Sequence, residues 1–144
     1  MREVLREAVT VDRSAAVAWN HLAQLERWPT WGRHIRRMTP SPSGALTEST
    51  SVILQMRNGA KTTMVVTEFE PPRRWVWEGR SFETLTRFEH QFEPVDGGGT
   101  RIWFLAWMSG PIAGPMGWIY GRMMKRNLAR GFPKLKAEIE VTPT

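Results

Sequence analysis

Residues Gly114 to Glu140 have the pattern of one long amphipathic helix, and this helix constrains the fold more than any other feature of the chain. Apolar residues recur there every three or four positions, so they share one helical face. The apolar face comprises Met116, Ile119, Tyr120, Met123, Leu128, Phe132, Leu135 and Ile139. No other predicted element is long enough to cover the concave face of a sheet. The layout therefore predicts one sheet wrapped around this helix.

The middle of the chain predicts a meander of short strands that are rich in aromatic and β-branched residues. Strong turn signals separate these strands, namely Asn58-Gly59, Pro71-Pro72 and Asp96–Gly99. Because connections this short join only antiparallel neighbours, the sheet is expected to be antiparallel. The expected strands are 46–56, 61–70, 75–79, 84–93 and 100–108.

The first forty residues predict one strand, two short helical segments and a second, basic strand. The expected elements are a strand over 3–11, a helix over 15–25, a short helix or turn over 28–31 and a strand over 33–39. Asp12 or Ser14 is suited to cap the first helix. Pro29 is expected to end that helix, because proline has no backbone N–H to donate to the preceding turn.

The size and composition fit a single domain over residues 1–144, with 41% hydrophobic residues. Cysteine is absent, which excludes disulfides, thiolate zinc sites and cysteine nucleophiles. Charged residues interrupt the first twenty positions, so no secretory signal fits there. No apolar run approaches the ~18 residues of a membrane-spanning helix. We therefore expect a cytoplasmic protein.

The formal net charge is +6, which raises the question of an anionic partner. Basic residues attract nucleic acid or anionic lipid, but they also occur as an ordinary solvated surface. Here they are scattered along the chain and are not accompanied by a recognition-helix or base-stacking signature. We therefore interpret the basic residues as an ordinary solvated surface and do not favour nucleic acid as a partner.

The order of these elements and several short motifs resemble the START-like or Bet v 1-like (SRPBCC) superfamily, in particular its polyketide cyclase/dehydrase branch. The matching segments are 16–19 (AVAW), 25–31 (LERWPTW), 66–74 (VTEFEPPRR), 92–94 (FEP), 98–101 (GGTR) and 133–138 (PKLKAE). The resemblance implies an α+β helix-grip fold, in which an antiparallel sheet wraps a long C-terminal helix around a hydrophobic cavity. It implies two short helices after the first strand. It does not imply cyclase activity, since one fold hosts many functions.

Two strands carry aromatic residues on one face. Trp75 and Trp77 share a face, and so do Phe88, His90 and Phe92, because side chains alternate along a strand. These residues either line a cavity or fill a core, and the two interpretations overlap. The other face of the second strand carries Arg87, Glu89, Gln91 and Glu93, which favours solvent on that side.

The only candidates for catalysis are His90 and Tyr120. An inward-facing neutral imidazole is able to hydrogen-bond a ligand oxygen or act as a general base. A structural histidine bonded to a neighbouring backbone group or carboxylate is the slightly favoured alternative. The three histidines, His21, His34 and His90, lack the spacing of a zinc hydrolase, and no Gly-x-Ser-x-Gly occurs. We expect neither a metal nor a cofactor, and whether the protein catalyses a reaction stays open.

The main hypothesis is that the protein binds a lipid-like or polycyclic small molecule in a cavity between the sheet and the last helix. The expected ligand-binding residues are Trp31, Trp75, Trp77, Phe88, His90, Phe92, Phe104, Met116, Tyr120 and Met123. Trp31 is expected at the mouth, since it precedes Gly32 at a corner between helix and strand.

Two alternatives remain at this stage. One is an aromatase/cyclase-type enzyme, in which such a cavity folds a reactive polyketide and excludes water. The other is a basic peripheral membrane or nucleic-acid binder. Residues 103–108 are apolar on both faces, so one face needs cover. The first helices, a second subunit or a membrane surface could cover it; a homodimer contact is the preferred explanation, and a membrane surface is not favoured.

Overall fold

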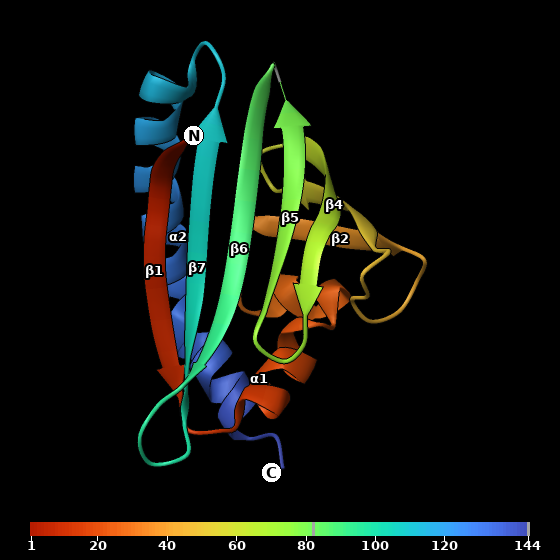
Figure 1. The fold of residues 1–144 in the computed structure, drawn as a ribbon, viewed down its shortest axis with the longest axis vertical. Helices are drawn as coiled ribbons and strands as arrows, with labels where there is room; N and C mark the ends of the chain where they lie inside the picture. The colour runs from red at the N-terminus through yellow and green to blue at the C-terminus, as the bar shows by residue number, and fades with distance from the viewer. Residues whose placement is uncertain (82, 144) are drawn as a thin grey trace.

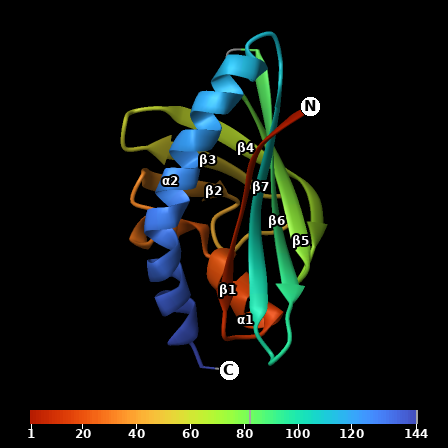
Figure 2. The same cartoon turned by 90° about the vertical axis from the view of Figure 1, so that its left-hand side faces the viewer.

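A computed structural model describes residues 1–81 and 83–143 as a curved antiparallel sheet that grips one long helix (Figures 1 and 2). The elements are β1 (Arg2–Val11), α1 (Ala15–Leu22), the 3₁₀ helix η1 (Leu25–Thr30), β2 (Ile35–Ser41), β3 (Ser51–Met56), β4 (Lys61–Glu70), β5 (Arg74–Ser81), β6 (Thr84–Pro94), β7 (Thr100–Ser109) and α2 (Ala113–Glu140). The α+β helix-grip architecture predicted from the sequence is confirmed.

The seven strands follow the order β1-β7-β6-β5-β4-β3-β2. Strands β1 and β2 therefore lie at opposite edges, and α1 and η1 carry the chain across one end of the sheet between them (Figure 1). The register shifts between Glu3 and Leu5, between Ile35 and Arg37, and between Val66 and Glu68. Such bulges bend a strand and increase its twist. The sheet thereby curves around α2 (Figure 2).

Three glycines let α2 approach its neighbours closely. A Cβ atom on Gly117 would lie 2.6 Å from Cγ1 of Val4, and one on Gly131 would lie 2.7 Å from the carbonyl oxygen of Trp31. A Cβ on Gly121 would collide with the carbonyl oxygen of Val4 in β1. The glycines thus set the distance at which α2 crosses the sheet, and with it the space left beneath the helix.

We predict that Gly121→Ala lowers the free energy of unfolding by about 1–2 kcal/mol, because overpacking against backbone costs more than the roughly 1 kcal/mol of helix propensity gained. Gly114→Ala is the matched control, since its Cβ would meet only Nη1 of Arg2 at 3.7 Å. That variant should be neutral or slightly stabilised. Urea unfolding of both proteins measures the difference, and equal stability of the two variants would contradict the close approach at Gly121.

The first helix is shorter than expected, and Pro29 does not end it. α1 ends at Leu22, where the N–H of Ala23 bonds the carbonyl of Trp19 at 2.7 Å. Pro29 lies inside η1, a 3₁₀ helix whose short length tolerates it. Of the two predicted N-cap residues, Asp12 and Ser14, the structure has Ser14, whose side chain accepts a hydrogen bond from the N–H of Val17.

The strand expected over 46–56 begins only at Ser51. Leu46 instead donates its N–H to Ala23 at 2.9 Å, and the N–H of Thr47 bonds the hydroxyl of Thr50 at 2.8 Å. These local bonds satisfy the backbone in place of a sheet partner. The last helix continues as one α-helix through Pro133. Within residues 1–81 and 83–143, none of the helices combines the length and the apolar character needed to cross a bilayer.

Candidate functional site

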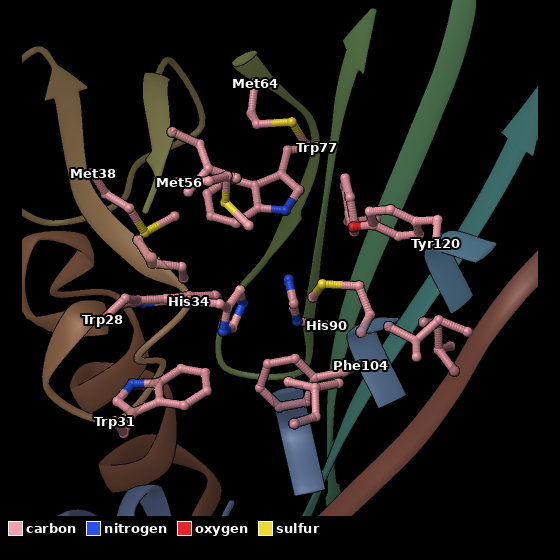
Figure 3. Close-up of a pocket in the computed structure, with 17 residues that line it drawn as sticks. Trp28, Trp31, His34, Met38, Met56, Met64, Trp77, His90, Phe104 and Tyr120 are labelled. Carbon is pink, nitrogen blue, oxygen red and sulfur yellow. The ribbon is translucent and has the colours of Figure 1, made fainter. Parts of the chain in front are cut away.

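An apolar cavity of about 70 Å³ lies between the concave face of the sheet and α2 (Figure 3). Its walls come from both edges of the sheet, its centre, and the middle of α2. The lining residues are Leu5, Trp28, Trp31, His34, Ile35, Met38, Leu54, Met56, Met64, Trp77, Phe88, His90, Phe104, Leu105, Tyr120, Met124 and Leu128. The only titratable side chains among them are those of His34, His90 and Tyr120.

The central wall follows from strand register. Trp77 of β5 pairs with Phe88 of β6, and His90 of β6 pairs with Phe104 of β7. Since paired residues point to the same face, these four side chains form one aromatic surface. The rings of His90 and Phe104 are 4.8 Å apart between centroids, in an edge-to-face arrangement. The period-two pattern of β6 therefore positions the imidazole over the cavity.

His90 is the buried polar group of this wall. Its ring contacts Trp28, Trp75, Trp77 and Phe104, with centroid distances of 4.7 to 5.7 Å. Among the described residues, its Nδ1 has no hydrogen-bond partner. Burial lowers the pKa of His90 to about 3, so the imidazole is neutral at physiological pH. A neutral imidazole offers one donor and one acceptor, and a ligand could use the free one.

Two further polar side chains reach the same cavity. The imidazole of His34, just before β2, projects into it from the wall opposite His90 (Figure 3), and burial lowers its pKa. Burial raises the pKa of the Tyr120 phenol, which therefore stays protonated. Tyr120 lies edge-on to Phe88 at 6.2 Å and forms no hydrogen bond with any described residue. The cavity thus holds neutral hydrogen-bonding groups in apolar surroundings.

A groove of about 250 Å³ continues the cavity toward the surface, and we call it the entrance groove. It shares Leu54, Met56, Met64, Phe88 and Tyr120 with the cavity. The groove is formed by the β3–β4 hairpin, the facing ends of β5 and β6, Ile112 just before α2, and the first turns of α2, where Met116 and Met123 contribute side chains. An occupant of the cavity would reach solvent along this path.

Residues 2–140 match the sequence profile of the family described as "Polyketide cyclase / dehydrase and lipid transport". The chain belongs to this family. The match confirms the resemblance seen in the sequence. Comparison with curated proteins found no match.

Solved structures show the same fold at low sequence identity. A hypothetical protein from Helicobacter pylori has a TM-score of 0.78 at 16% identity, over 93% of this chain and 86% of that one. A START superfamily protein from Mycobacterium smegmatis has a TM-score of 0.71 at 14% identity, over 96% and 98%. The Zhui aromatase/cyclase from Streptomyces sp. R1128 has a TM-score of 0.68 at 16% identity, over 94% and 92%. These likenesses establish the fold of this polyketide cyclase / dehydrase family member.

The residues proposed from the sequence fall into three groups in the structure. Those that line the cavity are Trp31, Trp77, Phe88, His90, Phe104 and Tyr120. Met116 and Met123 line the entrance groove. Trp75 and Phe92 instead lie in the core beneath α1, where both rings contact Trp19. Neither of them lines the cavity. The indole Nε1 of Trp75 has no hydrogen-bond partner among the described residues.

The sequence predicted Trp31 at the mouth of the cavity, but the structure places it elsewhere. It is 2% exposed and lies against Gly131, about ten residues along α2 from the groove residues Tyr120 and Met123. At a rise of 1.5 Å per residue, roughly 15 Å of helix separates Gly131 from the groove residues. Trp31 therefore lies at the closed inner end of the cavity.

Sequence reasoning predicted only Met116 and Met123 at the site and missed the other methionines that line it. Seven of the eight methionines line the cavity or the groove, and the remaining one is Met1. The cavity contains Met38, Met56, Met64 and Met124, and the groove also contains Met108, Met116 and Met123. They are distributed over five different elements, so no local periodicity connects them. His34 was missed for a similar reason, because it belongs to a basic segment that looks solvent-exposed in sequence.

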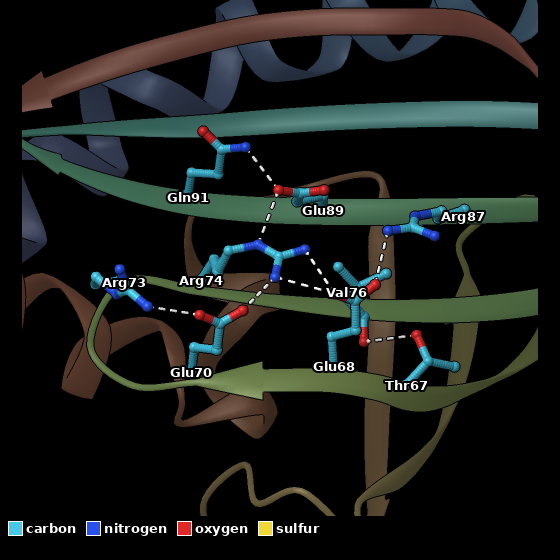
Figure 4. Close-up of polar contacts among 9 residues, drawn as sticks. All are labelled: Thr67, Glu68, Glu70, Arg73, Arg74, Val76, Arg87, Glu89 and Gln91. Carbon is cyan, nitrogen blue, oxygen red and sulfur yellow. Dashed lines mark hydrogen bonds and ion pairs between the residues drawn. The ribbon is translucent and has the colours of Figure 1, made fainter.

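The ionic residues of β4, β5 and β6 lie on the opposite, convex face of the sheet (Figure 4). Arg74 bonds Glu89 at 3.1 Å and Glu68 at 3.0 Å, and it also pairs with Glu70. Arg87 bonds Glu68 at 2.8 Å. This network ties three strands together away from the cavity. Over the described part of the chain, no group of three or more potential ligands could hold a metal ion.

Proposed function

We propose that this protein binds a hydrophobic small molecule, lipid-like or polycyclic, in the cavity between the sheet and α2. The observation that carries the proposal is an apolar cavity whose buried His90 Nδ1 lacks a partner among the described residues. A buried polar atom without a partner costs free energy, and a ligand oxygen or N–H would satisfy it. The polar end of the ligand is therefore assigned to His90 and His34, and its apolar body to the entrance groove.

The methionine lining supports a ligand larger than the cavity of about 70 Å³. One water occupies a share of about 30 Å³ in the liquid, so the cavity by itself suits only a small group. Methionine side chains are unbranched and rotate freely about three bonds, so they repack around a guest with little strain. Together with the groove of about 250 Å³, a methionine-lined cavity is suited to a ligand that extends toward the surface.

We predict that His90→Phe weakens ligand binding by about 1–3 kcal/mol, the cost of removing the hydrogen bond to a buried polar group. The substitution keeps an aromatic ring in the same place, so the melting temperature should change little. Fluorescence titration with parinaric acid, a fatty acid with a single carboxyl group, measures affinity, and a thermal scan measures stability. A variant with unchanged affinity and a lower melting temperature would make His90 a structural residue.

His21→Phe is the matched control for that experiment. His21 is buried and bonds Oε1 of Glu138 at 2.9 Å, outside the cavity. Its replacement leaves the carboxylate without that partner, so it should lower stability and leave affinity unchanged. His90→Phe is thus expected to lower affinity but not stability, whereas His21→Phe is expected to lower stability but not affinity.

Native mass spectrometry of freshly purified protein tests the proposal directly. A co-purified molecule of defined mass that is lipid-like or polycyclic would support it and would identify the chemical class. A protein that carries no ligand and shows no saturable binding of parinaric acid would overturn it.

An aromatase/cyclase-type enzyme is the second candidate. The observation that favours it is the presence of a neutral imidazole, His90, and a protonated phenol, Tyr120, in one apolar cavity. Such a pair could accept a proton at one site and donate one at another. Conversion of a linear polyketide mimic by the wild type but not by His90→Phe would establish this activity in addition to binding.

The homodimer expected from residues 103–108 remains a prediction. Other residues of the same chain cover much of the outer face of β7, which weakens the reason for expecting a homodimer. Leu105 is buried, and Trp103 bonds Glu93 through Nε1 at 3.2 Å beneath the guanidinium of Arg6.

A further inference from the structure

The exposed apolar side chains of this protein gather at the entrance groove. Among residues 1–81 and 83–143, five of the nine large hydrophobic residues that are exposed occur between positions 112 and 123. We call them the entrance patch, and they are Ile112, Met116, Trp118, Ile119 and Met123. Trp118 is 65% exposed and Ile119 is 57% exposed. Large apolar side chains concentrated on one part of a protein surface mark an interaction site.

The surroundings of the entrance patch are basic. No Asp or Glu occurs between Gly97 and Ala137, whereas Arg122 lies within the patch and Lys125 and Arg126 follow it along α2. The guanidinium of Arg122 lies over the Trp118 ring at 5.1 Å. Arg2 reaches the first turn of α2 from β1. The neighbouring acidic groups are Glu3, which is paired with Arg6 at 2.6 Å, Glu7, which lines the same groove between β1 and α2 as Trp118, and Glu83, beside Gly110. Positive charge therefore predominates.

The entrance patch is continuous with the binding path. Ile112, Met116 and Met123 line the entrance groove, and Ile119 is exposed on the same helix. Trp118 lies farther around α2, where it lines a shallow groove against β1 together with Arg122 and Lys125. Whatever covers the patch therefore faces the opening of the cavity. A partner that is itself apolar inside and anionic outside would match both the exposed side chains and the charges around them.

We propose that the entrance patch docks on an anionic phospholipid bilayer, with Trp118 and Ile119 inserted between headgroups and the entrance groove open toward the lipid. Tryptophan and aliphatic side chains flanked by Arg and Lys are the composition of interfacial helices. Each basic residue near an anionic membrane adds to the attraction. A second copy of this chain fits less well, because a symmetric contact would bring Arg122, Lys125 and Arg126 of both copies together.

The docking surface goes beyond the proposed ligand binding and does not depend on it. Trp118 and Ile119 line neither the cavity nor the entrance groove. A protein that binds parinaric acid but not vesicles would leave the proposed function intact and remove only the docking surface. The two ideas are therefore tested separately on the same preparations.

Vesicle flotation tests the docking surface. The wild type is expected to float with vesicles of phosphatidylcholine and phosphatidylglycerol in equal parts and to stay behind with phosphatidylcholine alone. The double variant Trp118→Ser/Ile119→Ser should bind the mixed vesicles about tenfold more weakly or worse, because two large apolar side chains no longer leave water. Arg122→Gln/Lys125→Gln should lose the preference for the anionic lipid.

Ile53→Ser/Val65→Ser is the matched control, since both residues are exposed hydrophobics on strands β3 and β4, away from the patch. It should float like the wild type, and all variants should keep the wild-type melting temperature and affinity for parinaric acid. Failure of the wild type to float with the mixed vesicles would overturn the proposal, as would an equal loss in the control. A dimer in analytical ultracentrifugation that Trp118→Ser/Ile119→Ser abolishes, with flotation unchanged, would assign the patch to a second copy instead.

Discussion

Leu135→Ala is expected to lower the free energy of unfolding by about 2–5 kcal/mol, because a large-to-small change in a closed core loses transfer energy and leaves a void. Leu135 is 0% exposed and lies in the C-terminal half of α2, where it belongs to the hydrophobic core and not to the cavity lining. The neighbouring structure therefore has no existing space into which it can relax. Urea unfolding followed by circular dichroism measures the change.

Ile119→Ala is the matched control on the same helix. The sequence places both residues on one apolar face, but Ile119 is 57% exposed. Its truncation should change stability by less than about 0.5 kcal/mol, as is usual at the surface. If Leu135→Ala also lowered the free energy of unfolding by less than about 0.5 kcal/mol, the core around the C-terminal half of α2 would not be closed.

The second large effect is expected in the pH dependence of stability. In the unfolded chain an imidazole binds a proton near its ordinary pKa of about 6.5. In the folded protein burial lowers the pKa of His90 to about 3. Between these values the unfolded state binds one more proton. Stability is therefore lost as pH falls, by about 1.4 kcal/mol per pH unit from this residue alone.

His90→Phe isolates that contribution, because the variant has no proton to bind at this position. The difference in unfolding free energy between variant and wild type should grow in favour of the variant as pH is lowered from about 7 to about 4.5. His34, whose pKa burial also lowers, contributes equally to both proteins and cancels. Parallel pH profiles of the two proteins would mean that His90 gains a proton in the folded state without penalty.

Part of the candidate site was accessible from sequence, because strand periodicity assigns side chains to a face. The alternation in β6 placed Phe88 and His90 together, and the structure has both in the cavity wall. The pattern of α2 likewise placed Tyr120 on the covered side of the helix. These assignments depend only on the geometry of single elements, which a sequence carries directly.

The same periodicity misassigned residues elsewhere on the same face. Trp75 and Phe92 point to the concave side like His90, yet α1 covers them, so they fill the core. Trp31, which follows η1 and is not part of the sheet, was expected at the mouth because it precedes Gly32, and it lies at the closed end beside Gly131. Alternation gives the side of a sheet on which a residue lies. It does not tell which helix covers that part of the sheet.

The sequence by itself determined the class of fold, since short turns require antiparallel strands and one long apolar face requires a sheet to cover it. Only the tertiary structure decided where that interior is packed and where it is hollow. Contacts between distant residues, such as Gly121 with Val4 and Gly131 with Trp31, fix the position of α2 over the curved sheet. The cavity is the space left by that position, so no single segment of the chain encodes it.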